Sequence, residues 1–144
     1  MAIENFIYFN GTCRPAVEFY AEVFGLEKPP FMICGDTPGN PDFVGTAADG
    51  ARGLIMYAGL RIKDSTVMFA DAPNGRQGQM GNSVYLTVNC DTIQETQEIF
   101  HKLAEGGQVQ LELQPVFFTE CLGSLTDKFG LNWFVVYYPQ SANS

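Results

Sequence analysis

The fold is decided by one stretch near the end of the chain, Gly123-Ser124-Leu125-Thr126-Asp127-Lys128-Phe129-Gly130-Leu131-Asn132-Trp133-Phe134-Val135-Val136-Tyr137. This pattern predicts a strand, a tight turn at Asp-Lys-Phe-Gly and a second apolar strand. Asp and Gly favour turns, whereas β-branched and aromatic residues favour strands. Residues 59–71 have the same shape, two strands joined by a short polar turn. The two hairpins therefore predict that the chain contains one structural unit in two copies.

The first half supplies a strand and a helix ahead of its hairpin. Residues 3–9 form a β-branched and aromatic run that predicts a strand. Apolar residues then recur at three- and four-residue spacing over 12–25, which predicts a helix with Thr12 as its N-cap. A short strand is expected over 31–34. Residues 35–53 are rich in Gly, Pro, Asn and Asp and predict a long loop of unassigned role.

The second half repeats this order. A strand is expected over 83–89 and a helix over 92–105. Asp91 or Thr92 is expected to cap this helix, and Thr92 and Glu95 have capping-box spacing. Alternating apolar residues over 109–113 predict a half-exposed strand.

The chain is thus expected to form a single α+β domain made of two βαβββ modules. The modules span about 1–72 and about 83–138, with 73–82 as the linker. We expect their mixed sheets to curl around a shared cavity, with both helices packed on the outside.

Composition excludes several classes of function. Hydrophobic residues make up 46% of the chain and charged residues 17%, which is typical of a packed domain. A net charge of −8 disfavours nucleic acid and anionic membrane surfaces as partners. No apolar run approaches the length of a membrane span, and Met-Ala-Ile-Glu-Asn lacks the basic region of a signal peptide. We therefore expect a cytoplasmic protein.

The four cysteines, Cys13, Cys34, Cys90 and Cys121, are widely spaced and form no Cys-x-x-Cys pair. A chain of this size does not need disulfides for stability, so free thiols that are buried or nearly so are expected. Cys121, next to Glu120, is a weak candidate for a thiol in a pocket.

The order and spacing of several short segments resemble a known superfamily over roughly residues 3–138. The segments include Tyr8-Phe9-Asn10-Gly11, residues 55–62, Gly123-Ser124-Leu125-Thr126-Asp127 and Phe129-Gly130. They are similar to the PhnB-like branch of the glyoxalase, bleomycin-resistance and dioxygenase group, the vicinal oxygen chelate superfamily. Some members of this branch carry a 3-demethylubiquinone methyltransferase-like label.

The resemblance implies a divalent metal held by His or Glu on the first and last strand of each module. The corresponding positions here are expected at Asn5, Met68, Tyr85 and Phe134. A second set in PhnB-like sequences, one His and one Glu, falls on Tyr57 and Gly59. Neither set contains an imidazole or a carboxylate, the ligands that such ions prefer. The sequence therefore predicts no cofactor and no metal at these positions.

Other catalytic motifs are missing from the chain. The lone histidine, His101, falls on the second helix beside Phe100 and is expected to be a solvated helix residue. No Gly-x-Ser-x-Gly, phosphate loop or Gly-x-Gly-x-x-Gly occurs.

Aromatic residues remain as candidates for a site. Taken singly, such residues most often fill the core, but together they are typical of an apolar cavity in which a few phenol hydroxyls orient a ligand. The candidate ligand-binding residues are Tyr8, Tyr57, Phe69, Tyr85, Phe118 and Phe134.

The leading hypothesis is a homodimeric protein that binds a small apolar or aromatic ligand without metal and with little or no catalysis. The alternative is a metal-dependent lyase, isomerase or dioxygenase-like enzyme of the same superfamily. A structural role for the dimer surface is a third reading. The residues do not identify the ligand.

Overall fold

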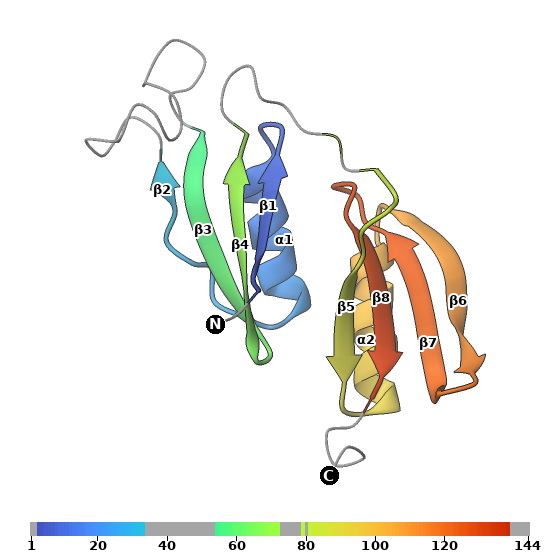
Figure 1. The fold of residues 1–144 in the computed structure, drawn as a ribbon. Helices are drawn as coiled ribbons and strands as arrows, with labels where there is room; N and C mark the ends of the chain where they lie inside the picture. Colours follow the sequence, from blue (N-terminus) through green and yellow to red (C-terminus); the bar gives the residue numbers. More distant parts are fainter. Residues whose placement is uncertain (1–2, 34–53, 73–78, 80, 139–144) are drawn as a thin grey trace. The chain divides into compact units, whose positions relative to one another are not determined.

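The computed structural model describes residues 3–33, 54–72, 79 and 81–138 (Figure 1). The chain divides into two compact units, 1–79 and 80–144, and the boundary falls inside the linker expected at 73–82. The long loop expected at 35–53 lies outside the described residues, as do Cys34 and most of the linker.

The first unit contains four strands and one helix in its described part. They are β1 (Asn5–Phe9), α1 (Cys13–Val23), β2 (Met32–Ile33), β3 (Ile55–Ile62) and β4 (Ser65–Asp71). The strands form one sheet in the order β1-β4-β3-β2. β1 runs parallel to β4 and the other neighbours are antiparallel.

The second unit repeats this topology. Its elements are β5 (Leu86–Cys90), α2 (Ile93–Ala104), β6 (Gln108–Val116), β7 (Thr119–Thr126) and β8 (Asn132–Tyr137). The sheet order is β5-β8-β7-β6, with β5 parallel to β8. The prediction of an α+β fold with two βαβββ modules is therefore confirmed, and both helices start and end within two residues of the expected ranges.

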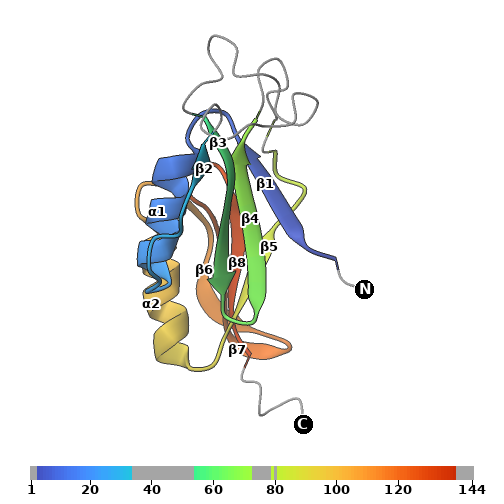
Figure 2. The ribbon, with the colours of Figure 1, turned by 90° about the vertical axis from the view of Figure 1, so that its left-hand side faces the viewer.

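Each helix covers one face of its own sheet (Figures 1 and 2). In the first unit Phe9 and Phe69 stack with ring centroids 6.1 Å apart, and Tyr20 of α1 stacks on Phe69 at 5.6 Å. All three side chains are buried. They form the core between α1 and the sheet.

The corresponding core of the second unit includes Trp133, Leu125 and Phe100, all buried. Gly123 of β7 allows α2 to approach closely, because a Cβ at this position would lie 2.6 Å from Cε2 of Phe100. Any larger residue at position 123 would displace that ring.

The two helices begin in different ways. At α2 the expected capping box is confirmed: Glu95 N–H donates to Thr92 Oγ1 at 3.0 Å, and Asp91 N–H donates to Glu95 Oε1 at 3.0 Å. At α1 Thr12 occupies the expected N-cap position, but its side chain makes no capping hydrogen bond. Instead the buried Asp71, at the end of β4, accepts from Cys13 N–H at 2.9 Å. A carboxylate satisfies this helix end better than a hydroxyl, since it complements the positive end of the helix dipole.

The turn between β7 and β8 is held by Asp127, which is 3% exposed. Its Oδ1 accepts from the N–H groups of Phe129 at 2.8 Å and Leu131 at 3.1 Å. Its Oδ2 accepts from the indole Nε1–H of Trp133 at 2.8 Å. One carboxylate thus links the turn to the core.

No helix in the described part of the chain combines the length and apolar character needed to span a membrane. The shared cavity expected between the modules stays a prediction.

Candidate functional site

Each sheet has a second face, opposite its helix, which we call the free face. Residues that pair directly across neighbouring strands share a face, and successive residues alternate between faces. In the first unit one row of pairs on the free face joins Phe6, Met68 and Gly59 across β1, β4 and β3. In the second unit the equivalent row joins Thr87, Phe134 and Ser124 across β5, β8 and β7.

These rows correct two of the positions expected to correspond to metal ligands. Asn5 pairs with Val67, so it lies on the helix side, and Phe6 is the partner of Met68. A shift of one residue along a strand moves a side chain to the other face, which explains the error. Tyr85 does lie on the free face, but Thr87 is the residue paired with Phe134.

The rows do not fit a divalent metal. The first offers only the thioether of Met68, and the second offers only the hydroxyls of Thr87 and Ser124. A side chain at position 59 would have to displace the Tyr57 ring, because a Cβ there would lie 2.9 Å from the Tyr57 hydroxyl oxygen. Within the described ranges no three His, Cys, Asp or Glu side chains gather as a possible metal site. Proteins hold hard and borderline ions mostly through carboxylate, imidazole or thiolate ligands, and these rows contain none of them.

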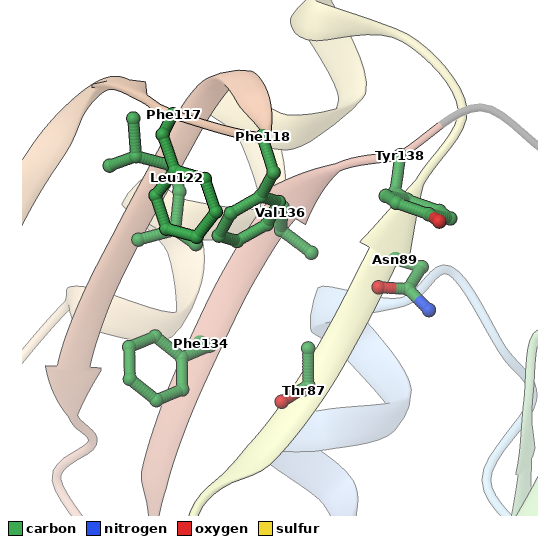
Figure 3. A pocket seen from close by; sticks show the side chains of 9 residues that line it. Thr87, Asn89, Phe117, Phe118, Leu122, Phe134, Val136 and Tyr138 are labelled. Carbon is green, nitrogen blue, oxygen red and sulfur yellow. The ribbon is translucent and has the colours of Figure 1, made fainter. Parts of the chain in front are cut away.

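A hollow of about 530 Å³ lies on the free face of the second unit (Figure 3). The side chains around it come from β5, β7, β8, the end of β6, the turn between β6 and β7, and the residue after β8. They are Thr87, Asn89, Val116, Phe117, Phe118, Leu122, Phe134, Val136 and Tyr138.

The hollow has an apolar wall and a short polar edge. Phe117 and Phe118 form the wall at the turn between β6 and β7, with ring centroids 5.0 Å apart and planes at 74°. Thr87 and Asn89 lie on β5, on the other side of the hollow, and both are exposed (Figure 3). All the described lining residues are uncharged. This composition suits a neutral, largely apolar molecule with one or two hydrogen-bonding groups.

The six predicted ligand-binding residues divide among three places. Phe118 and Phe134 line the hollow. Tyr85 lies at its rim, since it stacks on Phe134 with centroids 4.7 Å apart. Tyr8 and Tyr57 lie on the free face of the first unit, with their ring centroids 5.0 and 6.4 Å from that of Phe6.

Phe69 is the exception among the six. It is fully buried between β4 and α1, so its interpretation as a ligand-binding residue is corrected to a core residue. The sequence could not decide this, because Val67, Met68 and Phe69 are consecutive apolar residues that hide the alternation between faces.

Sequence reasoning also missed the other seven lining residues, which are Thr87, Asn89, Val116, Phe117, Leu122, Val136 and Tyr138. The available signal was the period of two: Thr87 and Asn89 follow Tyr85 at two and four residues, so they share its face. Val136 and Tyr138 follow Phe134 at the same spacing, although Tyr138 comes one residue after the end of β8.

The reactive side chains lie away from the hollow. Cys13 and Cys121 are buried free thiols, and Cys90 is buried as well. Cys121 does not line the hollow, although its neighbour Leu122 does, and burial raises the pKa of its thiol. His101 is exposed on α2, which covers the opposite face of the sheet.

Comparison with known proteins supports the family resemblance. The family described as 3-demethylubiquinone-9 3-methyltransferase matches residues 1–136. Protein YjdN of Escherichia coli (strain K12) is 27% identical over 140 residues, which cover 94% of both chains. These matches confirm the PhnB-like relationship.

Solved structures agree with this relationship. Protein PA1353 from Pseudomonas aeruginosa has a TM-score of 0.78 and 30% identity, and the match covers 96% of this chain and all of that one. The putative 3-demethylubiquinone-9 3-methyltransferase, PhnB protein, from Bacillus cereus has a TM-score of 0.73, 24% identity and the same coverage. A member of the glyoxalase/bleomycin resistance protein/dioxygenase superfamily from Sphaerobacter thermophilus has a TM-score of 0.56 and 12% identity, covering 96% of this chain and 98% of that one. The last likeness shows the fold alone.

Proposed function

Since the chain belongs to the family described as 3-demethylubiquinone-9 3-methyltransferase, within the glyoxalase/bleomycin resistance superfamily, we propose that it binds a small neutral molecule without a divalent metal. The observation that carries this proposal is the hollow on the free face of the second unit. Its aromatic wall offers apolar contact, and Thr87 and Asn89 offer hydrogen bonds. Such sites are usually concave and apolar with few polar groups.

The chemistry of the two rows supports binding without metal. Phe6 and Gly59 cannot coordinate an ion, and a lone thioether from Met68 is too soft for the ions that activate oxygen-rich substrates. A metal-dependent lyase, isomerase or dioxygenase-like activity, the alternative reading, would need ligands that these rows do not supply.

The family description names a methyl transfer, but the hollow supports binding better than catalysis. Transfer of a methyl group to a hydroxyl is helped by a base that removes the proton. The described lining residues include no carboxylate, imidazole or amine. We therefore propose a binding role with little or no catalysis.

We further propose that the protein acts as a homodimer. β1 and β2 are edge strands of the first sheet, and β5 and β6 are edge strands of the second. Exposed strand edges are commonly covered by another chain, and a two-fold pair is the commonest arrangement.

The proposal is tested by titrating chelator-treated protein with 2-naphthol and following binding by calorimetry. We expect saturable binding with one site per chain. Phe118→Ala should weaken it several-fold, because this ring is 53% exposed and its loss removes wall area at little cost to folding. The matched control is Val109→Ala on β6, which removes an exposed apolar side chain outside the hollow.

Equal effects of Phe118→Ala and Val109→Ala would show that the hollow is not the site. Binding that disappears with chelator and returns with zinc or manganese would contradict the metal-free part of the proposal.

A further inference from the structure

A chain of hydrogen bonds crosses the free face of the second unit beside the hollow. The Tyr85 hydroxyl donates to Gln110 Oε1 at 2.6 Å, and Gln110 Nε2 donates to Thr126 Oγ1 at 2.7 Å. Thr126 Oγ1 then donates to Asn132 Oδ1 at 2.8 Å. We call these four side chains, Tyr85, Gln110, Thr126 and Asn132, the polar relay.

The direction of every bond in the relay is fixed by its buried end. Asn132 Nδ2 donates to the backbone carbonyls of Gly81 at 2.9 Å and Val84 at 3.1 Å. Carbonyl oxygens can only accept, so the amide must present Nδ2 to them and Oδ1 to Thr126. The Thr126 hydroxyl therefore donates its proton to Asn132 Oδ1. Thr126 Oγ1 can then only accept from Gln110, so Gln110 presents its Nε2 to Thr126. Gln110 must therefore turn Oε1 toward Tyr85.

This direction determines what the Tyr85 hydroxyl can offer a ligand. A phenol has one hydroxyl proton, and Tyr85 donates it to Gln110 Oε1. Toward a ligand the Tyr85 oxygen can therefore act only as an acceptor, through its lone pairs. The bond to Gln110 is exposed, which leaves the hydroxyl oxygen within reach of solvent or a bound molecule. Tyr85 stacks on Phe134, which lines the hollow, and lies two residues from Thr87, about 7 Å along the strand.

We propose that the polar relay makes Tyr85 a specificity-determining acceptor at the rim of the hollow, which favours ligands with an O–H or N–H donor over ligands that only accept. Gln110 is the positioning residue. This inference rests on the proposed function, because it assumes that a ligand occupies the hollow.

The decisive variant reverses the relay without removing it. Gln110→Lys has only donors, so it can bond both Tyr85 Oη and Thr126 Oγ1, and the phenol proton becomes available to the ligand. Gln110 is exposed on β6, so the lysine can remain solvated. Gln114→Lys is the matched control, because it adds the same charge on the same strand, at an exposed residue that pairs with Leu122 but is not itself a lining residue and takes no part in the polar relay.

The probes are 2-naphthol, which can donate, and 2-acetylnaphthalene, which can only accept. The measured quantity is the ratio of their dissociation constants in calorimetric titrations. We expect Gln110→Lys to shift this ratio about fivefold toward 2-acetylnaphthalene, the amount expected for one exchanged neutral hydrogen bond. Gln114→Lys should leave the ratio unchanged. The shift should vanish in the double variant Gln110→Lys/Tyr85→Phe, since the phenol is then absent.

The outcomes separate the two proposals. Binding of both probes with a ratio that Gln110→Lys does not move would overturn the relay while leaving the binding function intact. A shift that persists in the double variant would mean that the lysine contacts the ligand directly, which also overturns it. Failure of wild-type protein to bind either probe would contradict the proposed function and this inference with it.

Discussion

Removal of the Asp127 carboxylate is expected to cost more stability than any substitution in the hollow. Asp127→Ala takes away the acceptor of three hydrogen bonds from a side chain that is 3% exposed. Each buried donor left without a partner costs about 1–3 kcal/mol. The N–H groups of Phe129 and Leu131 lie in a turn where water can partly replace the carboxylate. The Trp133 indole is only 2% exposed, so its N–H stays unpaired.

The sum is about 3–5 kcal/mol, with the indole contributing the largest share. In a chain of this length such a loss lowers the thermal midpoint by roughly 10 °C. Asp127→Asn is expected to cost less, because its oxygen can still serve the turn while its NH₂ group faces the Trp133 donor.

Thermal and urea unfolding of Asp127→Asn, Trp133→Phe and the double variant test this reasoning. If the lost indole contact accounts for most of the destabilisation, Asp127→Asn should lower the free energy of unfolding less in the Trp133→Phe variant than in the wild type. The coupling energy between the two substitutions should be about 1 kcal/mol or more. Additive effects of the two substitutions, or a loss below 1 kcal/mol for Asp127→Ala, would refute the role given to this carboxylate.

Four further predictions follow from the fold and the site. Asp71→Ala should destabilise the protein by about 2–4 kcal/mol, because Asp71 also accepts from Ile55 N–H, whereas Thr12→Ala should change stability by less than about 0.5 kcal/mol; urea unfolding compares the two. Burial, reinforced by the Asp71 carboxylate, raises the pKa of the Cys13 thiol from 9.0 to about 12. The folded state therefore holds this proton longer than the unfolded chain, so stability should fall between about pH 9 and pH 12, and Cys13→Ala should reduce that fall in unfolding measured across this range. Elemental analysis of protein purified without chelator should find no stoichiometric zinc, nickel, iron or manganese. Light scattering should give twice the chain mass of 15.9 kDa, and a monomer mass at tens of micromolar would contradict the homodimer.

The fold could be predicted because its signals are local and repeated. The apolar period of α1 and α2, the capping box of Thr92 and Glu95 and the turn around Asp127 each depend on residues close in sequence. The repeat then confirmed each assignment in the other half. A fold can be predicted from its sequence when local preferences and the overall pattern agree in this way.

The site was harder to predict because it depends on which face of the sheet each strand residue points to. β4 has three consecutive apolar residues, so the sequence gives no sign that Met68 faces away from α1 while Phe69 packs beneath it. The same ambiguity placed Asn5 on the wrong face. The polar relay could not be predicted for a different reason. It joins Tyr85, Gln110 and Asn132, which are up to 47 positions apart in the sequence, and predicting it requires the register of four strands.

The two free faces show why one backbone topology does not give one site. Gly59 and Ser124 occupy equivalent places, each paired with the central residue of its row. In the first unit the missing side chain at Gly59 lets Tyr57 from the same strand lie over that place, beside the Phe6 ring. In the second unit Tyr85, the residue before the edge strand β5, stacks on Phe134, and the hollow lies on the neighbouring part of the face. The duplicated backbone thus determines where side chains point. The residues at these positions, Tyr57 and Gly59 in the first unit and Tyr85 and Ser124 in the second, determine which part of each face can receive a ligand.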